Sequence, residues 1–313
     1  MKDSAPVAIF AFNRPLHVER LFESLATNPE SVDSRYFIFC DGPRSTNDDV
    51  SVRQTRDVVD RFARTHQCQV FKQPANQGLA KSIIRGIDTV LKEHDRFIVL
   101  EDDLVVSRHF LRFVNRSLDV FRDRPEIGCV SGFMYPTHPA TPRAVLLPFV
   151  TSWGWATWAD RWQAYNPDGA ALASQIERAG RRREFDLGGS FHCWGMLQDQ
   201  IYGYSSSWWI RWYATLFLRN QLSVWPGVSL LLNAGMDGSG THCGESLRYE
   251  GVLADVDVEI DTGLTAPSAE YLNAIKAFLA PTRHSDILLA VRRHIPRRFF
   301  HQVLRPFAKR FVG

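Results

Sequence analysis

The sequence predicts an α/β fold in which a mostly parallel sheet is flanked by helices, and three observations support this prediction. First, four short apolar runs have the length of strands that are buried on both faces: 7–12, 37–40, 97–100 and the weaker 127–130. Second, segments between these runs carry apolar residues at helical spacing. Third, strands and helices alternate, which implies right-handed crossovers between parallel strands.

Two segments in this part of the chain each have one apolar helical face. The first contains Leu79, Ile83, Ile84, Ile87, Val90 and Leu91, and the second contains Phe110, Phe113, Val114, Leu118 and Phe121. Neighbouring side chains on a helix surface are three or four positions apart, and these residues follow that spacing. We therefore expect helices over 79–91 and 110–121.

The composition changes from about residue 133, where Pro, Trp and Gly become dense and the apolar residues lose a clear period. Eight of the nine tryptophans lie between Trp153 and Trp212. Two interpretations are open: a large aromatic core, or a pocket for sugars, whose apolar faces pack on aromatic rings. We expect an irregular, Trp-rich second half.

Composition also bounds the class of protein. The 313 residues are 45% hydrophobic and 23% charged, as in globular domains, and no run approaches the ~18–20 apolar residues of a membrane span. Five cysteines are scattered without CxxC spacing, which argues against a disulfide framework or a zinc site and suits a reducing compartment. We expect the chain to start inside its fold and to be cytoplasmic.

The C-terminal segment is strongly basic. No acidic residue follows Asp286, and seven basic residues do: Arg292, Arg293, Arg297, Arg298, Arg305, Lys309 and Arg310. Phe300, Val303, Leu304, Phe307 and Phe311 add an apolar stripe, although Pro306 would kink a helix there. A solvated surface helix is one interpretation. The other is a basic amphipathic tail over 281–313 that binds the anionic inner face of the cell membrane; we expect no nucleic-acid partner.

The most informative site is the acidic triplet Glu101, Asp102 and Asp103, which directly follows the apolar run 97–100. Three adjacent carboxylates repel one another unless a divalent cation and sugar hydroxyls lie beside them, and such oxygens suit Mg²⁺ or Mn²⁺. Open α/β sheets bind ligands at the carboxyl ends of their strands, where this triplet is expected. A helix N-terminus capped by Asp103 or Ser107 is the alternative, which explains one acid but not three.

The segment IVLEDDL at 98–104 resembles the acidic DXD-type motif of GT-A glycosyltransferases, most closely N-acetylglucosaminyltransferase I and related bacterial sugar transferases. Five further segments resemble that family in the expected order: VAIFAFNRP at 7–15, FCDGP at 39–43, NQGLA at 76–80, SWGW at 152–155 and GSGTH at 238–242. The resemblance covers about residues 6–245. It implies a Rossmann-like GT-A fold.

The resemblance also implies roles for single residues. Asp103 would be the direct metal ligand, Asp102 would bind ribose or donor-sugar hydroxyls, and Glu101 a donor-sugar hydroxyl. Asp41 would accept a hydrogen bond from a uracil-type N–H, and His242 would touch the metal or the diphosphate. The alternatives are a turn aspartate ahead of a Gly-Pro pair and a satisfied loop histidine. The resemblance implies further nucleotide-sugar contacts at Asn13 and Arg14, in the segment 7–15, and at Asn76 and Gly78, in the segment 76–80.

The general base is harder to assign. The segment SSSWW at 205–209 has no acid where the family has an acidic pair beside a tryptophan, so we expect Asp199 to be the base, with Asp237 as the second candidate. Arg211, in an Arg-Trp pair that recurs in processive relatives, is expected to be a second catalytic cation. For Asp199, the alternatives are an N-cap or a buried salt bridge to Arg211. For Arg211, the alternative is a salt bridge at the surface or at the edge of the core.

We therefore expect a metal-dependent hexosyltransferase that moves a sugar from a UDP-sugar to a glycan or lipid-linked glycan, with inversion, in bacterial surface polysaccharide synthesis. Residues 1–280 would form one GT-A domain, with a nucleotide-sugar half at 1–135 and an acceptor half at 136–280. A sugar-nucleotidyltransferase is one alternative, but the turn Asn13-Arg14-Pro15 lacks the glycine-rich loop that a triphosphate needs. A non-catalytic carbohydrate- or lipid-binding module is the other.

Overall fold

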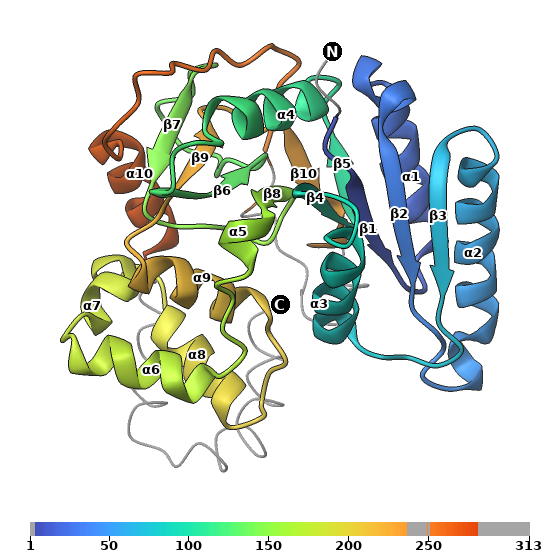
Figure 1. The fold of residues 1–313 in the computed structure, drawn as a ribbon, viewed down its shortest axis with the longest axis horizontal. Coiled ribbons are helices and arrows are strands. Elements are labelled where there is room, and N and C mark those ends of the chain that lie inside the picture. Colours follow the sequence, from blue (N-terminus) through green and yellow to red (C-terminus); the bar gives the residue numbers. More distant parts are fainter. Residues whose placement is uncertain (1–3, 237–248, 250, 281–313) are drawn as a thin grey trace.

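The computed structural model describes residues 4–236, 249 and 251–280. Its centre is an eight-stranded sheet of order β3-β2-β1-β4-β8-β6-β9-β7, flanked by helices (Figure 1). The strands are β1 (Val7–Ala11), β2 (Arg35–Cys40), β3 (Gln67–Lys72), β4 (Arg96–Glu101), β6 (Ile127–Ser131), β7 (Ala144–Leu147), β8 (Trp155–Trp158) and β9 (Leu222–Pro226). A second, two-stranded sheet pairs β5 (Leu104–Val106) with β10 (Leu231–Asn233) in antiparallel fashion.

The first half of the sheet is entirely parallel. β3, β2, β1 and β4 pair in that order without a break in register, and β1 is buried along its whole length. The long apolar runs exist because each of these inner strands is covered on both faces. Both the strands and the helices expected here are found, so the predicted α/β class with a mostly parallel, helix-flanked sheet is confirmed.

The connections between these strands determine where the sheet can form a binding crevice. The chain runs through α1 (Pro15–Ala26) to β2, through α2 (Asp49–Ala63) to β3 and through α3 (Leu79–Val90) back to β4. Because the direction reverses after β3, right-handed crossovers put α1 and α2 on one face and α3 on the other. The carboxyl ends of β1 and β4 therefore flank a switch point, where open α/β sheets form their binding crevice.

The second half of the sheet is mixed. β8 lies antiparallel between β4 and β6, while β6 pairs in parallel with β9, and β7 closes the edge in antiparallel fashion. α4 (Phe110–Val120) follows β5, and its aromatic face is fully buried. Short 3₁₀ turns complete the connections: Pro29–Asp33, Thr46–Asp48, Leu187–Gly189 and Ala234–Met236.

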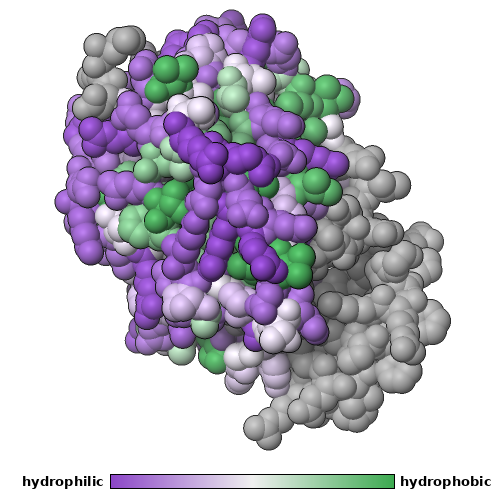
Figure 2. Space-filling view, turned by 90° about the vertical axis from the view of Figure 1, so that its right-hand side faces the viewer, coloured by the Kyte–Doolittle hydropathy of each residue, from purple (hydrophilic) through white to green (hydrophobic). Residues whose placement is uncertain are grey.

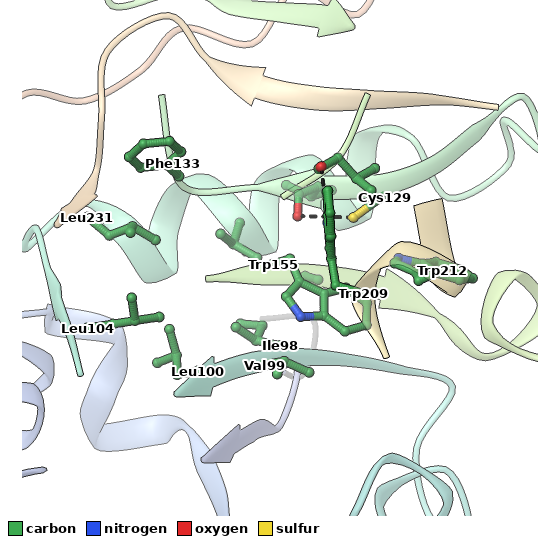
Figure 3. Close-up of a cluster of buried hydrophobic side chains, with 14 of the residues drawn as sticks. Ile98, Val99, Leu100, Leu104, Cys129, Phe133, Trp155, Trp209, Trp212 and Leu231 are labelled. Carbon is green, nitrogen blue, oxygen red and sulfur yellow. Dashed lines mark hydrogen bonds between the residues drawn. The ribbon is translucent and has the colours of Figure 1, made fainter. Parts of the chain in front are cut away.

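The tryptophans mainly form a core. Six of the eight between Trp153 and Trp212 are buried: Trp155, Trp158, Trp162, Trp208, Trp209 and Trp212. Trp155 of β8 stacks on Trp208 at 5.3 Å and lies 5.9 Å from Trp212. Figure 3 shows Trp155, Trp209 and Trp212 in one cluster of buried side chains that also contains Cys129 of β6 and Ile98 of β4. Of the two open interpretations, the structure favours the aromatic core, and only Trp153 and Trp194 are half-buried.

The second half is more regular than expected, because it contains a helical lobe. Its helices are α5 (Ala159–Trp162), α6 (Gly169–Arg178), α7 (Arg182–Phe185), α8 (Cys193–Ile201) and α9 (Trp209–Leu218), and α10 (Ala269–Leu279) follows later in the chain. α6, α8 and α9 pack on one another, and eight of the ten residues of α9 are buried. A helix that is covered on nearly every side loses the polar face that makes its period visible in a sequence.

The outer face beyond α2 is mainly hydrophilic, with scattered apolar residues (Figure 2). In the described part of the chain, no helix combines the length and the hydropathy that crossing a bilayer requires. The expected basic tail at 281–313 lies outside the described residues, and so do His242 and Asp237.

Candidate functional site

A cavity of about 390 Å³ opens at the carboxyl ends of β1, β2 and β4. Eight of the predicted site residues line it: Asn13, Arg14, Asp41, Asn76, Gly78, Glu101, Asp102 and Asp103. They come from four separate segments, and the parallel pairing of the strands brings these segments together at one edge. The volume lies in the range of small-molecule sites.

The triplet at the end of β4 is a group of carboxylates in a poorly solvated place. Burial, and then repulsion from Asp103 and Asp102, raises the pKa of Glu101 well above its ordinary value. Burial, and then the charge of Asp103, raises the pKa of Asp102 to about 7. Burial also raises the pKa of Asp103, against the opposing effects of Arg14 and His17. The three groups resist simultaneous ionisation, so the site favours a cation.

Hydrogen bonds orient two of these carboxylates. The backbone N–H of Phe12 donates to Oδ2 of Asp102 at 3.0 Å, and Nη1 of Arg14 donates to Oδ2 of Asp103 at 3.0 Å. The turn that follows β1 therefore holds the acids that follow β4. Ala234 N–H also donates to the carbonyl of Asp103 at 2.7 Å, which ties the turn after β10 to the triplet.

Gly235 is a site residue that sequence reasoning missed. A Cβ atom at this position would lie 2.2 Å from Oδ2 of Asp103, so a larger residue would displace the carboxylate or the turn. Gly235 reaches this place because β10 pairs with β5, directly after the triplet. The sequence carried no signal for this contact, because it depends on a pairing between strands that are far apart in the chain.

The donor set fits Mg²⁺ or Mn²⁺ bound together with a ligand. Carboxylate oxygens are the hard ligands that these ions prefer, and a neighbouring cation would favour the charged form of these acids, whose pKa values are raised mainly by burial. Within the described ranges, no group of three or more His, Cys, Asp or Glu residues is arranged to hold a metal ion by itself. Mg²⁺ is often bound by only one or two carboxylates plus substrate phosphates. Asp103 would supply such a carboxylate.

Asp41 organises the loop that precedes α3. Its Oδ1 accepts the N–H groups of Gly42 at 2.9 Å and Gln77 at 2.7 Å, and its Oδ2 accepts that of Gly78 at 3.0 Å. An ionised carboxylate has about four acceptor positions, so one on Oδ2 is left for a ligand. Asp41 is thus a turn residue, as the alternative interpretation held, and it keeps the capacity to accept one N–H. Asn76 supports the same loop by donating to the carbonyl of Gly42 at 3.1 Å.

Asp48 is the centre of a second group that sequence reasoning missed. It accepts hydrogen bonds from Nδ2 of Asn13 at 2.9 Å and from Nε of Arg44 at 3.0 Å. The bonded guanidinium of Arg44 holds the pKa of Asp48 at about 2. That guanidinium also lies over the ring of Phe12, 4.8 Å from its centroid. Asp48 thereby positions two residues of the cavity wall, Asn13 and Arg44.

The apolar part of the cavity comes from two stacked rings. The ring centroids of Phe10 of β1 and Phe39 of β2 lie 5.1 Å apart, and the two rings are almost parallel. α3 packs against them at Gly86, where a Cβ atom would lie 2.5 Å from the ring of Phe10. Leu79 and Ser82, on the first turn of α3, complete this end. A flat and partly apolar ligand group suits this end of the cavity.

One residue of the helical lobe reaches the cavity. α8 ends in a Schellman motif, in which Gly203 has φ 73°, and the N–H of Tyr204 donates to the carbonyl of Asp199 at 2.8 Å. The chain then continues to Ser206, which lines the cavity. The site is thus built from both halves of the chain.

The two predicted catalytic residues lie outside this lining. Asp199 is inside α8 and partly buried, so it is not the N-cap that one alternative suggested. Arg211 is on α9, where its guanidinium donates to the carbonyls of Ser207 at 3.3 Å and Pro167 at 3.2 Å. Their roles stay predictions.

No family model matches the chain. Among solved structures, it is similar to glucosyl-3-phosphoglycerate synthase from Mycobacterium tuberculosis in complex with Mn²⁺, UDP and glucosyl-3-phosphoglycerate, with 13% identity over 57% of this chain and 68% of that chain and a TM-score of 0.35. It is similar to a putative nucleotide-diphospho-sugar transferase from Desulfovibrio desulfuricans G20, with 11% identity, 53% and 67% coverage and a TM-score of 0.31. It is also similar to a UDP-glucose pyrophosphorylase complexed with UDP-glucose, with 8% identity, 74% and 94% coverage and a TM-score of 0.36. These likenesses concern the fold alone.

Proposed function

We propose that the protein is a metal-dependent glycosyltransferase that takes a sugar from a UDP-sugar and transfers it to a glycan or a lipid-linked glycan. One observation carries the proposal. Glu101, Asp102 and Asp103 lie side by side in a cavity at the switch point of a parallel sheet, with pKa values raised by burial and, for Glu101 and Asp102, also by the neighbouring carboxylates. A diphosphate-bound cation and sugar hydroxyls are the ligands that such a group accommodates best.

The residues divide the donor between them. Asp41, through the remaining acceptor position on Oδ2, would accept an N–H of the base, beside the apolar end formed by Phe10 and Phe39. Asp102 and Glu101 would accept hydrogen bonds from ribose or sugar hydroxyls. Asp103 would hold the divalent cation, whose chemistry is to neutralise the negative charge that develops on the departing diphosphate.

The acceptor side is assigned to residues 136–280, and the nucleotide-sugar side to residues 1–135. Ser206 supports this division, because it lines the same cavity as the loops after β1, β2 and β4 but comes from the helical lobe. For an inverting transfer, a carboxylate on the acceptor side removes the proton of the attacking hydroxyl, and Asp199 is the residue we propose. We further propose that the enzyme acts in bacterial surface polysaccharide synthesis at the inner membrane face, with the basic segment 281–313 as its membrane contact.

Thermal unfolding with nucleotides tests the proposal. UDP with Mn²⁺ should raise the melting temperature, EDTA should remove the shift, and GDP should produce a smaller one. A panel of nucleotide sugars, assayed for hydrolysis, then identifies the donor. Asp103→Asn should lose orders of magnitude in turnover while keeping its fold. Full activity in EDTA contradicts the metal requirement. Release of pyrophosphate from a nucleoside triphosphate would indicate a nucleotidyltransferase, and binding without turnover a carbohydrate-binding module.

A further inference from the structure

The carboxylate proposed to hold the metal already has a cationic partner. Nη1 of Arg14 lies 3.0 Å from Oδ2 of Asp103, and the two side chains are only 14% and 15% exposed. Gly235 packs against the same oxygen, since a Cβ atom there would come within 2.2 Å of it. This oxygen of Asp103 is therefore enclosed between a guanidinium and a backbone turn.

The backbone around Arg14 is fixed by its neighbours. Arg14 precedes Pro15, the first residue of α1, and its φ and ψ of −122° and 76° keep it outside the helical region, as a following proline favours. Its carbonyl accepts the N–H of Val18 at 3.1 Å, which starts the helix. The guanidinium thus reaches the end of β4 from an anchored position.

A second arginine of the same cavity provides a comparison. Arg44 also pairs with an aspartate, but its partner is Asp48, and its side chain is 50% exposed. The Arg14–Asp103 pair lies within the triplet, whereas Arg44 is held away from it on the wall beside Phe12. The two arginines therefore carry the same charge in the same cavity with different access to the proposed metal ligand.

We propose that Arg14 is a positioning residue that occupies Asp103 in the nucleotide-free protein, so that a divalent cation binds well only together with the diphosphate. This inference rests on the proposed function. A metal ion that approaches Asp103 alone must compete with a fixed positive charge in a poorly solvated place, where charges are weakly screened. A diphosphate changes the balance, because it brings negative charge and offers the guanidinium a planar, two-pronged partner.

Mn²⁺ binding to the nucleotide-free protein tests this directly. Free Mn²⁺ is measured by electron paramagnetic resonance at about pH 8, where competition from protons is small. Arg14→Gln should bind Mn²⁺ about tenfold more tightly than the wild type, which corresponds to ~1.4 kcal/mol. Arg44→Gln is the matched control and should change the affinity little. Thermal melting confirms that each variant is folded. Arg14→Lys keeps the charge but loses the two-pronged guanidinium, so its Mn²⁺ affinity should lie between those of the wild type and Arg14→Gln.

A second measurement uses UDP as the probe. In the wild type, UDP should tighten Mn²⁺ binding, and Mn²⁺ should tighten UDP binding by the same factor, since coupling is reciprocal. In Arg14→Gln this factor should fall, because the nucleotide-free site already accepts the metal. Adding Asp103→Asn to Arg14→Gln should remove the gain in affinity.

The outcomes separate the inference from the function. Unchanged Mn²⁺ affinity in folded Arg14→Gln, or an equal gain in Arg44→Gln, overturns the inference while the proposed function stands if the wild type still binds Mn²⁺ with UDP. A gain that survives Asp103→Asn also overturns it, because the metal then lies elsewhere. If no variant binds Mn²⁺ with or without UDP, the metal-dependent function fails, and the inference fails with it.

Discussion

Oδ2 of Asp41 accepts the backbone N–H of Gly78 at 3.0 Å, and this bond joins the end of β2 to the start of α3 across 37 positions of the chain. Two further N–H groups reach Oδ1 of the same carboxylate. Asp41 is 7% exposed, so water does not readily replace these bonds. One side chain therefore shapes the loop that lines the proposed base end of the cavity.

Asp41→Asn should destabilise this loop and weaken UDP binding. An amide offers one oxygen and directs N–H groups from its other end, so it cannot accept from both Gln77 and Gly78. Leaving a buried backbone N–H unpaired costs about 1–3 kcal/mol, which urea unfolding measures. Asp60→Asn, at an exposed pair with Lys72, is the control and should change stability by less than about 1 kcal/mol. Equal stability of the two variants would contradict the role of Asp41.

Gly235→Ala should damage the triplet without affecting the core. The new Cβ would lie 2.2 Å from Oδ2 of Asp103, so the carboxylate or the turn after β10 must move. We expect turnover to fall by at least about tenfold, because displacements of the order of 1 Å at a catalytic group are costly. Gly195→Ala in α8 is the matched control, since the nearest atom lies 4.0 Å away and alanine favours a helix. Normal turnover and Mn²⁺ binding in Gly235→Ala would show that Asp103 is not held this tightly.

The triplet should make the metal-free protein less stable as the pH rises. The pKa of Asp102 is raised to about 7 by burial and by Asp103, whereas an unfolded aspartate titrates near ~3.9. Between these values the folded state binds the extra proton, so the free energy of unfolding falls with rising pH and the loss is complete above the folded pKa. Melting temperatures of the wild type should decline from about pH 4 to about pH 7, and those of Asp102→Asn should decline less. Identical pH profiles would refute this.

The parallel half of the sheet could be predicted from the sequence because its inner strands are covered on both faces and therefore carry continuous apolar runs. β3 could not, because it is the edge strand and its burial alternates along Gln67–Lys72. The helices of the lobe were missed for the opposite reason. α9 is buried on nearly all sides, and its aromatic residues belong to a core that reaches Trp155 of β8.

The residues of the site also differ in whether a local sequence pattern reveals them. The acids of the triplet are adjacent in sequence and follow a strand, so their pattern is visible without a structure. No local pattern identifies Gly235, Ser206 or Asp48, since long-range pairing or a helix cap brings each of them to the cavity or to its wall. Asp48 could have drawn attention as an acid after β2, but nothing in the sequence links it to Asn13.

Asp199 is proposed as the general base, although its side chain lies outside the cavity lining. The base of an inverting transfer lies on the acceptor side of the sugar, opposite the diphosphate, so it is not one of the triplet. Asp199 belongs to the helical lobe, and its carbonyl accepts the N–H groups of Tyr204 and Ser205, directly before Ser206 of the cavity lining. The end of α8 therefore borders the site, although Asp199 itself does not line the cavity.

Asp199→Asn should reduce turnover of the identified UDP-sugar by about 10²–10⁴-fold, the usual effect of removing a general base. Because asparagine keeps the shape of the side chain, UDP affinity and melting temperature should hardly change. Asp168→Ala is the matched control in the same lobe. Asp168 caps α6 by accepting the N–H of Ala171 at 3.0 Å, so its loss should cost about 1 kcal/mol of stability and leave turnover unchanged. If Asp199→Asn instead loses stability in proportion to activity, its role is structural, and if it keeps near-normal turnover, Asp237 becomes the residue to test.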